Sequence, residues 1–271
     1  MLMIWFMRFK ISKIAESHGK EKLKLIDAHI HLSGSDLHPA TLAEGERLGI
    51  RLFIGSCLGE FNLQPSFDEV YKANNDMAAV IRRHLNRVSG YCYVNPRHGE
   101  QAISDFRSRI EEDSMIGMKL WVSTYCNDPL VFPFVEQAIA YRVPILIHTW
   151  RKTVSQLPYE STAFHIADLA ERYPEAIIIM AHMGGQVESA MNTIAPYTNV
   201  RVDTSGTPIG ASEVAIAVER LGANRVIFGS DLPIACLASN IGKVVGAGLT
   251  PEQLELIMGG NMERILAEGI R

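Results

Sequence analysis

Short apolar runs alternate with longer amphipathic segments from residue 23 to the end of the chain. Several runs are almost continuously hydrophobic, such as Ile145-Leu146-Ile147 and Ile177-Ile178-Ile179-Met180. Such runs are typical of strands that are buried on both faces of a parallel sheet. The pattern predicts eight strands, at residues 23–31, 51–56, 88–94, 117–122, 144–148, 176–182, 200–204 and 225–230.

The segments between these runs carry apolar residues three and four positions apart, which is the spacing of one helix face. Acidic residues such as Asp68 lie near predicted helix starts, and basic residues such as Arg82 lie near helix ends. Both placements agree with the helix dipole. The predicted helices cover residues 41–48, 67–84, 101–112, 129–141, 161–173, 186–195, 211–221 and 251–268.

This eightfold alternation predicts an α/β protein with a single (β/α)8 barrel over residues 23–271, preceded by an N-terminal extension at residues 1–22. Parallel strands need crossover connections, and the 271-residue length suits one such barrel. The alternative is an open doubly wound sheet. That fold normally has a glycine-rich phosphate turn after its first strand, where this chain has His29-Ile30-His31-Leu32.

Charge and cysteine content narrow the functional classes. The formal net charge is -4 and no dense basic run is present, so we expect no nucleic-acid partner. The four cysteines are scattered without a CxxC pair, which indicates free thiols in a reducing compartment. The apolar run at residues 1–7 is far shorter than the roughly 20 residues of a membrane span and lacks signal-peptide flanks. We therefore expect a cytoplasmic protein without a membrane partner.

Histidine and aspartate side chains lie where the predicted strands end. His29 and His31 point to one face of the first strand, about 7 Å apart along the backbone. His148, His182 and Asp231 end the fifth, sixth and eighth strands. The carboxyl ends of barrel strands form the active face, so these side chains should converge there. Imidazoles with one carboxylate are a ligand set for zinc, manganese, iron or cobalt.

Three further residues fall on the same predicted face. Lys119 lies in the fourth strand, and Trp150 and Arg151 follow the fifth. The guanidinium of Arg151 could bind a substrate carboxylate through two parallel hydrogen bonds. Four of the candidate positions also have a purely structural interpretation. His148 or His182 could be a core histidine bonded to the backbone, Asp231 a helix cap, and Arg151 a solvated loop arginine.

Taken together, the strand-end motifs resemble the amidohydrolase superfamily, most closely its amidohydrolase-related branch, which includes the aminocarboxymuconate-semialdehyde decarboxylase-like enzymes. The resemblance runs from Leu25 to about Leu266. Its motifs are Ile26-Asp27-Ala28-His29-Ile30-His31, Gly117-Met118-Lys119-Leu120, Pro144-Ile145-Leu146-Ile147-His148, Ala181-His182-Met183-Gly184-Gly185, Asp203-Thr204-Ser205, Phe228-Gly229-Ser230-Asp231-Leu232-Pro233 and Gly260-Asn261.

The resemblance implies one divalent metal ion, with zinc expected before manganese, iron or cobalt. Its ligands would be His29, His31, His148 and Asp231. Asp231 would also act as the catalytic acid and base, and His182 would orient water and substrate. Lys119 would be an unmodified substrate-binding residue, together with Arg151 and Trp150. The alternative is a two-metal site in which a carboxylated Lys119 and His182 hold the second ion.

The expected function is a metal-dependent hydrolase that uses a metal-activated water on an amide, lactone or similar bond of a small molecule. A non-oxidative decarboxylase of a carboxylated aromatic or muconate-like acid is the alternative within this fold. The short chain favours hydrolysis, because the decarboxylases of this kind tend to carry longer loop insertions. A non-catalytic ligand-binding barrel is the alternative of a different class. The resemblance also implies a homodimer.

Overall fold

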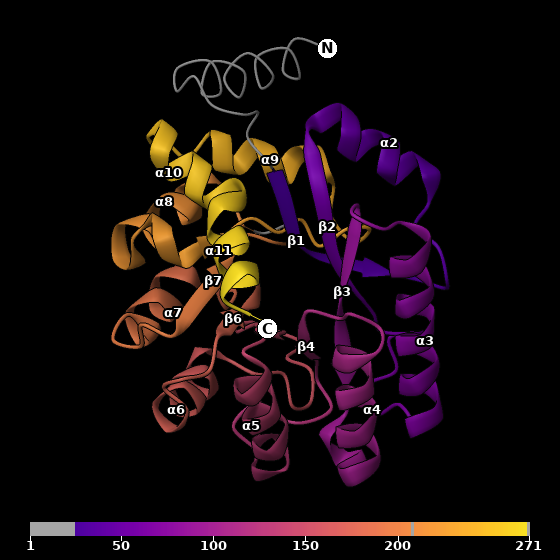
Figure 1. The fold of residues 1–271 in the computed structure, drawn as a ribbon. Helices are drawn as coiled ribbons and strands as arrows, with labels where there is room; N and C mark the ends of the chain where they lie inside the picture. Colours follow the sequence, from indigo (N-terminus) through magenta and orange to yellow (C-terminus); the bar gives the residue numbers. More distant parts are fainter. Residues whose placement is uncertain (1–24, 207–208, 270–271) are drawn as a thin grey trace.

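The computed structural model describes residues 25–206 and 209–269. Within this part of the chain, eight parallel strands form one sheet in the order β1 to β8, surrounded by helices (Figure 1). The strands are β1 (Leu25–Leu32), β2 (Ile50–Cys57), β3 (Val88–Val94), β4 (Gly117–Leu120), β5 (Ile145–Ile147), β6 (Ile178–Met180), β7 (Val200–Asp203) and β8 (Val226–Ile227).

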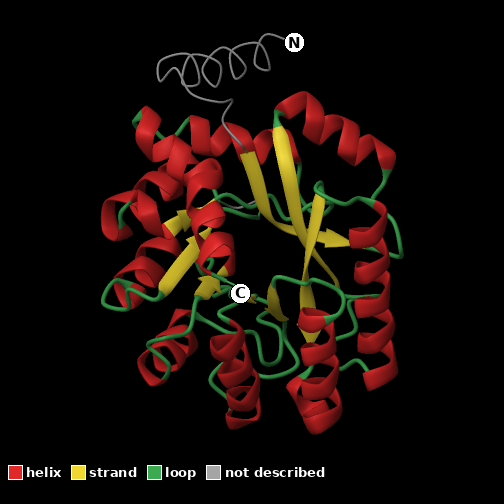
Figure 2. Cartoon of the chain, in the orientation of Figure 1, coloured by secondary structure: helices red, strands yellow, loops and turns green. Residues whose placement is uncertain are grey.

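Helices follow the strands and cover the outside of the sheet (Figure 2). The α-helices are α2 (Pro39–Leu48), α3 (Phe67–Arg83), α4 (Gly99–Glu111), α5 (Phe132–Tyr141), α6 (Ala163–Arg172), α7 (Val187–Ile194), α8 (Ala211–Leu221), α9 (Leu237–Val245), α10 (Pro251–Glu255) and α11 (Asn261–Glu268). No helix of the described residues is long and apolar enough to cross a membrane.

The first and last strands meet through backbone hydrogen bonds that extend beyond the short β8. Ala28 N donates to Phe228 O at 3.0 Å, and Asp231 N donates to His29 O at 2.8 Å. These bonds bring the end of β1 beside the segment after β8. The predicted (β/α)8 barrel is confirmed, and the alternative of an open doubly wound sheet is wrong.

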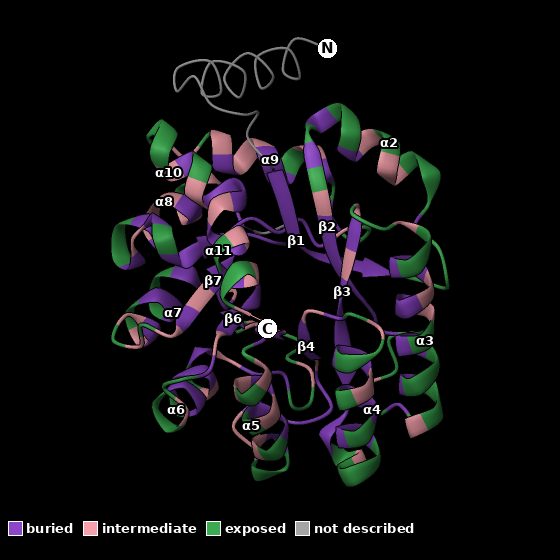
Figure 3. Cartoon of the chain, viewed as in Figure 1, coloured by how far each residue is buried: buried purple, intermediate pink, exposed green. Residues whose placement is uncertain are grey.

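The strands are apolar on both faces, and buried apolar residues therefore form two layers. The strands are almost entirely buried, and the outward faces of the helices are exposed (Figure 3). A small cluster fills the barrel interior and includes Ile26, Ile54, Tyr91 and Leu146. A much larger cluster lies between the sheet and the helices. The continuously apolar runs therefore pack on both faces, as the sequence predicts.

The last third of the chain differs from the prediction in two places. Helix α9 was not predicted, although Leu237, Ile241 and Val244 give it an apolar face at four- and three-residue spacing. The predicted helix at residues 251–268 contains a π-helical segment, Leu256–Gly260, between α10 and α11. The predicted extension at residues 1–22 lies outside the described residues, so the predicted domain division stays a prediction.

Candidate active site

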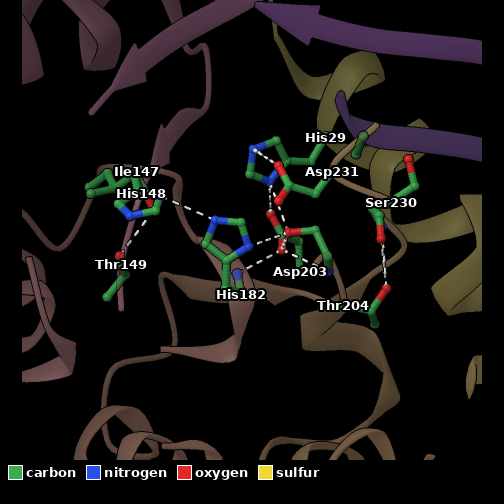
Figure 4. A network of polar contacts seen from close by, with 12 residues as sticks. His29, Ile147, His148, Thr149, His182, Asp203, Thr204, Ser230 and Asp231 are labelled. Atoms are coloured by element: carbon green, nitrogen blue, oxygen red, sulfur yellow. Dashed lines mark hydrogen bonds and ion pairs between the residues drawn. The ribbon is translucent and has the colours of Figure 1, made fainter. Parts of the chain in front are cut away.

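Three buried side chains converge where β1 ends and the chain leaves β8. His29 Nε2 lies 3.3 Å from His31 Nε2. Asp231 Oδ1 lies 3.3 Å from His31 Nε2 and 3.8 Å from His29 Nε2. Figure 4 shows His29 and Asp231 side by side, with His182 next to them. One ligand atom from each of His29, His31 and Asp231 lies within 4.8 Å of the others, so this cluster could hold a metal ion.

The surrounding residues fix which atoms face the cluster. His29 Nδ1 lies 2.8 Å from Asp203 Oδ2, and Ser56 Oγ lies 3.3 Å from His31 Nδ1. Both rings are thereby anchored through Nδ1 and turn Nε2 inward. Asp231 Oδ1 is buried yet has no hydrogen-bond partner among the described residues. A buried carboxylate oxygen without a donor is costly unless something positive fills the place. The cluster therefore fits a divalent cation.

The cluster also has the protonation states that a metal requires, namely neutral imidazoles and an ionised carboxylate. Burial lowers the pKa of His29 well below its ordinary value, and the nearby Lys119 ammonium lowers it further. Burial likewise lowers the pKa of His31. Burial alone would raise the pKa of Asp231, but the close contact with His31 and the neighbouring imidazoles of His29 and His182 bring it well below its usual range.

Lys119 projects from β4 into the same place. Its Nζ lies 2.9 Å from His29 Nε2, and the residue is fully buried. Burial lowers the pKa of Lys119 to about 8, against the opposing attraction of Asp203 and Asp231. A buried ammonium group thus stands against the inward nitrogen of His29. The structure places the predicted Lys119 within the cluster.

His148 and His182 form a second group on the β5 and β6 side of the barrel. His182 Nε2 lies 3.2 Å from His148 Nδ1, and His182 Nδ1 lies 2.9 Å from Ser205 Oγ. Ser205 Oγ is also 3.0 Å from His29 Nδ1, so this hydroxyl connects the two groups. His148 is not one of the three converging ligands, because its inward nitrogen faces His182. Its role as a metal ligand stays a prediction.

The turn after β6 places His182 through unusual backbone angles. His182, Met183, Gly184 and Gly185 all have positive φ values, from 47° to 80°. Left-handed angles are disfavoured for residues with a Cβ, so the two glycines ease this turn. A Cβ on Gly185 would lie 2.4 Å from Cδ1 of Trp150. Gly185 therefore leaves room for Trp150, whose ring centroid is 5.0 Å from that of His182.

Arg151 lies apart from the histidines. The residue is exposed, and its guanidinium lies 5.9 Å from the ring centroid of Phe164. Among the described residues, no hydrogen bond or ion pair joins the Arg151 side chain to the histidine groups. Its predicted role in binding a substrate carboxylate stays a prediction.

Four further polar residues complete the site, although the sequence analysis assigned none of them a role. Asp203 ends β7 and Ser205 follows it, and both were recognisable only as part of a motif. Glu160 lies in the loop before α6, where no periodic pattern exists. Lys243 lies on the unpredicted helix α9 and donates from Nζ to Gly206 O at 2.8 Å. Burial lowers the pKa of Lys243 to about 8, against the attraction of Asp203 and Asp231.

The fold and the site define an enzyme-like class: a (β/α)8 barrel with a buried histidine and aspartate cluster at the carboxyl ends of its strands. The family model described as Amidohydrolase matches residues 26–267. The chain therefore belongs to the amidohydrolase family, and the predicted resemblance is confirmed. No curated protein matches this sequence.

Several solved structures share the fold. The 2,6-dihydroxybenzoate decarboxylase from Rhizobium is 16% identical, with a TM-score of 0.75 over 90% of this chain and 98% of that chain. The 5-carboxyvanillate decarboxylase from Sphingomonas paucimobilis is 16% identical, with a TM-score of 0.73 over 92% of this chain and 100% of that chain.

A third similar structure contains a metal ion. The dihydroxybenzoic acid decarboxylase from Polaromonas, with bound manganese and the inhibitor 2-nitroresorcinol, is 17% identical. Its TM-score is 0.75 over 90% of this chain and 97% of that chain. Nearly the whole length of each of these three chains is matched, so the likeness in fold extends over the entire barrel.

Proposed function

We propose that this protein is a metal-dependent, non-oxidative decarboxylase of a small aromatic acid. The observation that carries the proposal is the charge balance of the buried site. The carboxylates of Asp231, Asp203 and Glu160 are matched by the ammonium groups of Lys119, Lys243 and Lys152. A divalent ion would add two positive charges, and Asp27, whose pKa burial raises to about 7, would offset at most one of them. A site with excess buried positive charge favours an anionic substrate.

His29, His31 and Asp231 would hold the ion, with the neighbouring His148 as the predicted fourth ligand. When bound, a divalent ion polarises the substrate oxygens that it contacts. The manganese in the similar Polaromonas structure supports a divalent ion and ranks manganese above the zinc that the sequence led us to expect. The three decarboxylases named above are similar in fold to this chain, and this similarity supports decarboxylation over hydrolysis.

The protein's own residues can bind and orient a hydroxylated aromatic acid. Lys119 would pair with the substrate carboxylate as a buried ammonium group. The Phe61 ring centroid lies 5.9 Å from that of His31 and 5.7 Å from that of Trp121. Trp150 lies against His182. These flat rings suit contact with an aromatic substrate.

Asp231 would move the proton. Its lowered pKa keeps it ionised in the free site, so it can accept the proton of a hydroxyl group beside the substrate carboxylate. Asp231 would then give this proton to the ring carbon that bears the carboxylate. The carbon-carbon bond breaks, its electron pair restores the aromatic ring, and carbon dioxide leaves. The hydroxyl group regains its proton from solvent, so each turnover consumes one proton.

Hydrolysis remains the second candidate, because an ionised Asp231 within the cluster is equally suited to take a proton from water. To separate the two, manganese-loaded protein would be incubated with hydroxybenzoates carrying a ¹³C-labelled carboxyl group, and in parallel with lactones and dipeptides. Release of labelled carbon dioxide that is abolished in Asp231→Asn is the expected result. Cleavage of a lactone or dipeptide with no carbon dioxide from any acid would overturn the proposal in favour of hydrolysis.

A further inference from the structure

A buried carboxylate stands behind His148, on the side away from the metal cluster. Glu160 Oε1 lies 2.8 Å from His148 Nε2. Glu160 comes from the loop between β5 and α6 and is only 1% exposed, although residues 153–156 of the same loop are exposed. An ionisable side chain is rarely buried so completely without a specific partner.

The other contacts of Glu160 are all with groups that can only donate. Lys152 Nζ donates to Oε1 at 2.8 Å. Gln156 Nε2 donates to Oε2 at 2.7 Å, and Leu157 N donates to Oε2 at 3.0 Å. Both oxygens therefore act as acceptors. The carboxylate requires His148 to carry a hydrogen on Nε2.

This requirement decides which nitrogen His148 can turn toward the site. A neutral imidazole has one N–H and one free lone pair. With the hydrogen on Nε2, the lone pair lies on Nδ1, which faces His182 at 3.2 Å. His29 and His31 are arranged the other way, with Nδ1 anchored and Nε2 inward. The two sides of the site thus present opposite ring nitrogens.

We infer that Glu160 is a positioning residue that fixes the tautomer and the ring orientation of His148 for metal binding. Carboxylates that hold the outer nitrogen of a metal-binding histidine orient the ring and raise its basicity. Through Lys152, Gln156 and Leu157, the same carboxylate connects the loop before α6 to the site. This role concerns metal binding and holds for either reaction.

Closing the loop does not by itself require Glu160. Trp150 N donates to Ser161 O at 2.9 Å, and Arg151 N donates to Gly184 O at 3.0 Å. These backbone bonds hold both ends of the loop against the barrel. The side chain of Glu160 is therefore not needed to close the loop and can position His148.

Two readouts test this inference without any assay of catalysis. The ¹⁵N chemical shifts of His148 in metal-free protein report which nitrogen carries the hydrogen, and titration with manganese alone, followed by electron paramagnetic resonance, gives its Kd. Wild-type protein should show the Nε2–H form. In Glu160→Gln the side-chain amide can present an N–H to Nε2, so the Nδ1–H form should appear. The manganese Kd should rise about 10- to 100-fold.

Two controls separate positioning of His148 from general damage. Glu171→Gln, at an exposed position on α6, should leave both readouts unchanged. In a His148→Asn background, Glu160→Gln should change the manganese Kd less than about twofold, because the residue through which it acts is gone. An Nδ1–H form in wild-type protein would overturn the inference even if Glu160→Gln failed to fold. So would an equal loss of manganese affinity in both backgrounds.

Discussion

The two sides of the barrel mouth use the same side chain for different purposes. On the β1 and β8 side, the inward nitrogens of His29 and His31 face Asp231 Oδ1, which no described donor satisfies. On the β5 and β6 side, the ring nitrogens of His148 and His182 face each other at 3.2 Å, and their outer nitrogens contact Glu160 and Ser205. All four histidines are pushed toward the neutral form by burial. The difference teaches that hydrogen-bond partners, rather than residue type, determine which ring nitrogen each histidine turns toward the site.

Removal of the Asp231 charge should have the largest effect, because it disables the β1 and β8 side of the barrel mouth. Asp231→Asn leaves the shape of the cluster but loses both the anionic ligand and the proton carrier. We expect kcat to fall by about 10²- to 10⁴-fold, with loss of the bound ion, measured by steady-state kinetics and elemental analysis. Asp68→Asn, at an exposed position of α3, is the matched control. Full activity in Asp231→Asn would contradict the assigned role.

Acid should weaken both sides of the mouth when no metal is present. A histidine whose folded-state pKa lies below 6.5 binds fewer protons in the folded than in the unfolded protein. Its contribution to the unfolding free energy is present above pH 6.5 and is lost as the pH falls through the folded-state pKa, by up to about 1.4 kcal/mol per histidine and pH unit. Asp27 acts in the opposite direction, because its pKa is raised to about 7.

Chemical denaturation of metal-free protein at pH 7.5, 6.5 and 5.5 measures this effect. The decline in unfolding free energy below pH 6.5 should be shallower in His182→Asn, which removes one of the four histidines. An identical pH profile in wild type and variant would show that burial of His182 in its neutral form contributes nothing to acid sensitivity.

Lys119 provides a second test of the metal-binding side, because its ammonium group occupies space there. The Nζ atom is 2.9 Å from the nitrogen of His29 that faces the cluster. Without this competing charge, Lys119→Met should bind manganese about tenfold more tightly, equivalent to 1.4 kcal/mol. The same change should raise KM for a carboxylate substrate, because the pairing cation is lost. Lys72→Met, at an exposed position of α3, is the control, and unchanged manganese affinity in Lys119→Met would count against direct competition.

The smallest effect is expected at Arg151, outside both histidine groups. Its guanidinium is exposed beside Phe164, so Arg151→Met should change KM less than about twofold and leave stability within about 0.5 kcal/mol. Steady-state kinetics and thermal unfolding measure these quantities. A tenfold rise in KM would instead support the carboxylate-binding role that the sequence led us to expect.

The sequence was informative wherever a periodic pattern ended in a reactive side chain. Strand periodicity located the barrel and the ends of β1, β5, β6 and β8, and so brought His29, His31, His182 and Asp231 to one face in advance. Lys119 was equally accessible, because it lies within a strand. His29, His31 and Lys119 are positioned by regular strand backbone, whose geometry is known before the fold is seen. His182 and Asp231 instead have positive φ values just beyond their strands.

The supporting residues could not be assigned in this way. Glu160 reaches His148 from an irregular loop, and Lys243 depends on a helix beyond the eight that the alternation suggested. Tertiary contacts of this kind produce no periodic pattern in the sequence. The pairing of His148 with His182, in place of a direct approach to the other ligands, likewise depends on side-chain orientations that spacing does not determine.

Anomalous diffraction at the manganese absorption edge, from crystals of manganese-loaded protein, tests the central claim most directly. We predict one anomalous peak per chain, within bonding distance of Nε2 of His29, Nε2 of His31 and Oδ1 of Asp231. A peak elsewhere, no peak at these three atoms, or a second peak between Lys119 and His182 would contradict the one-metal site on which the proposed decarboxylase depends.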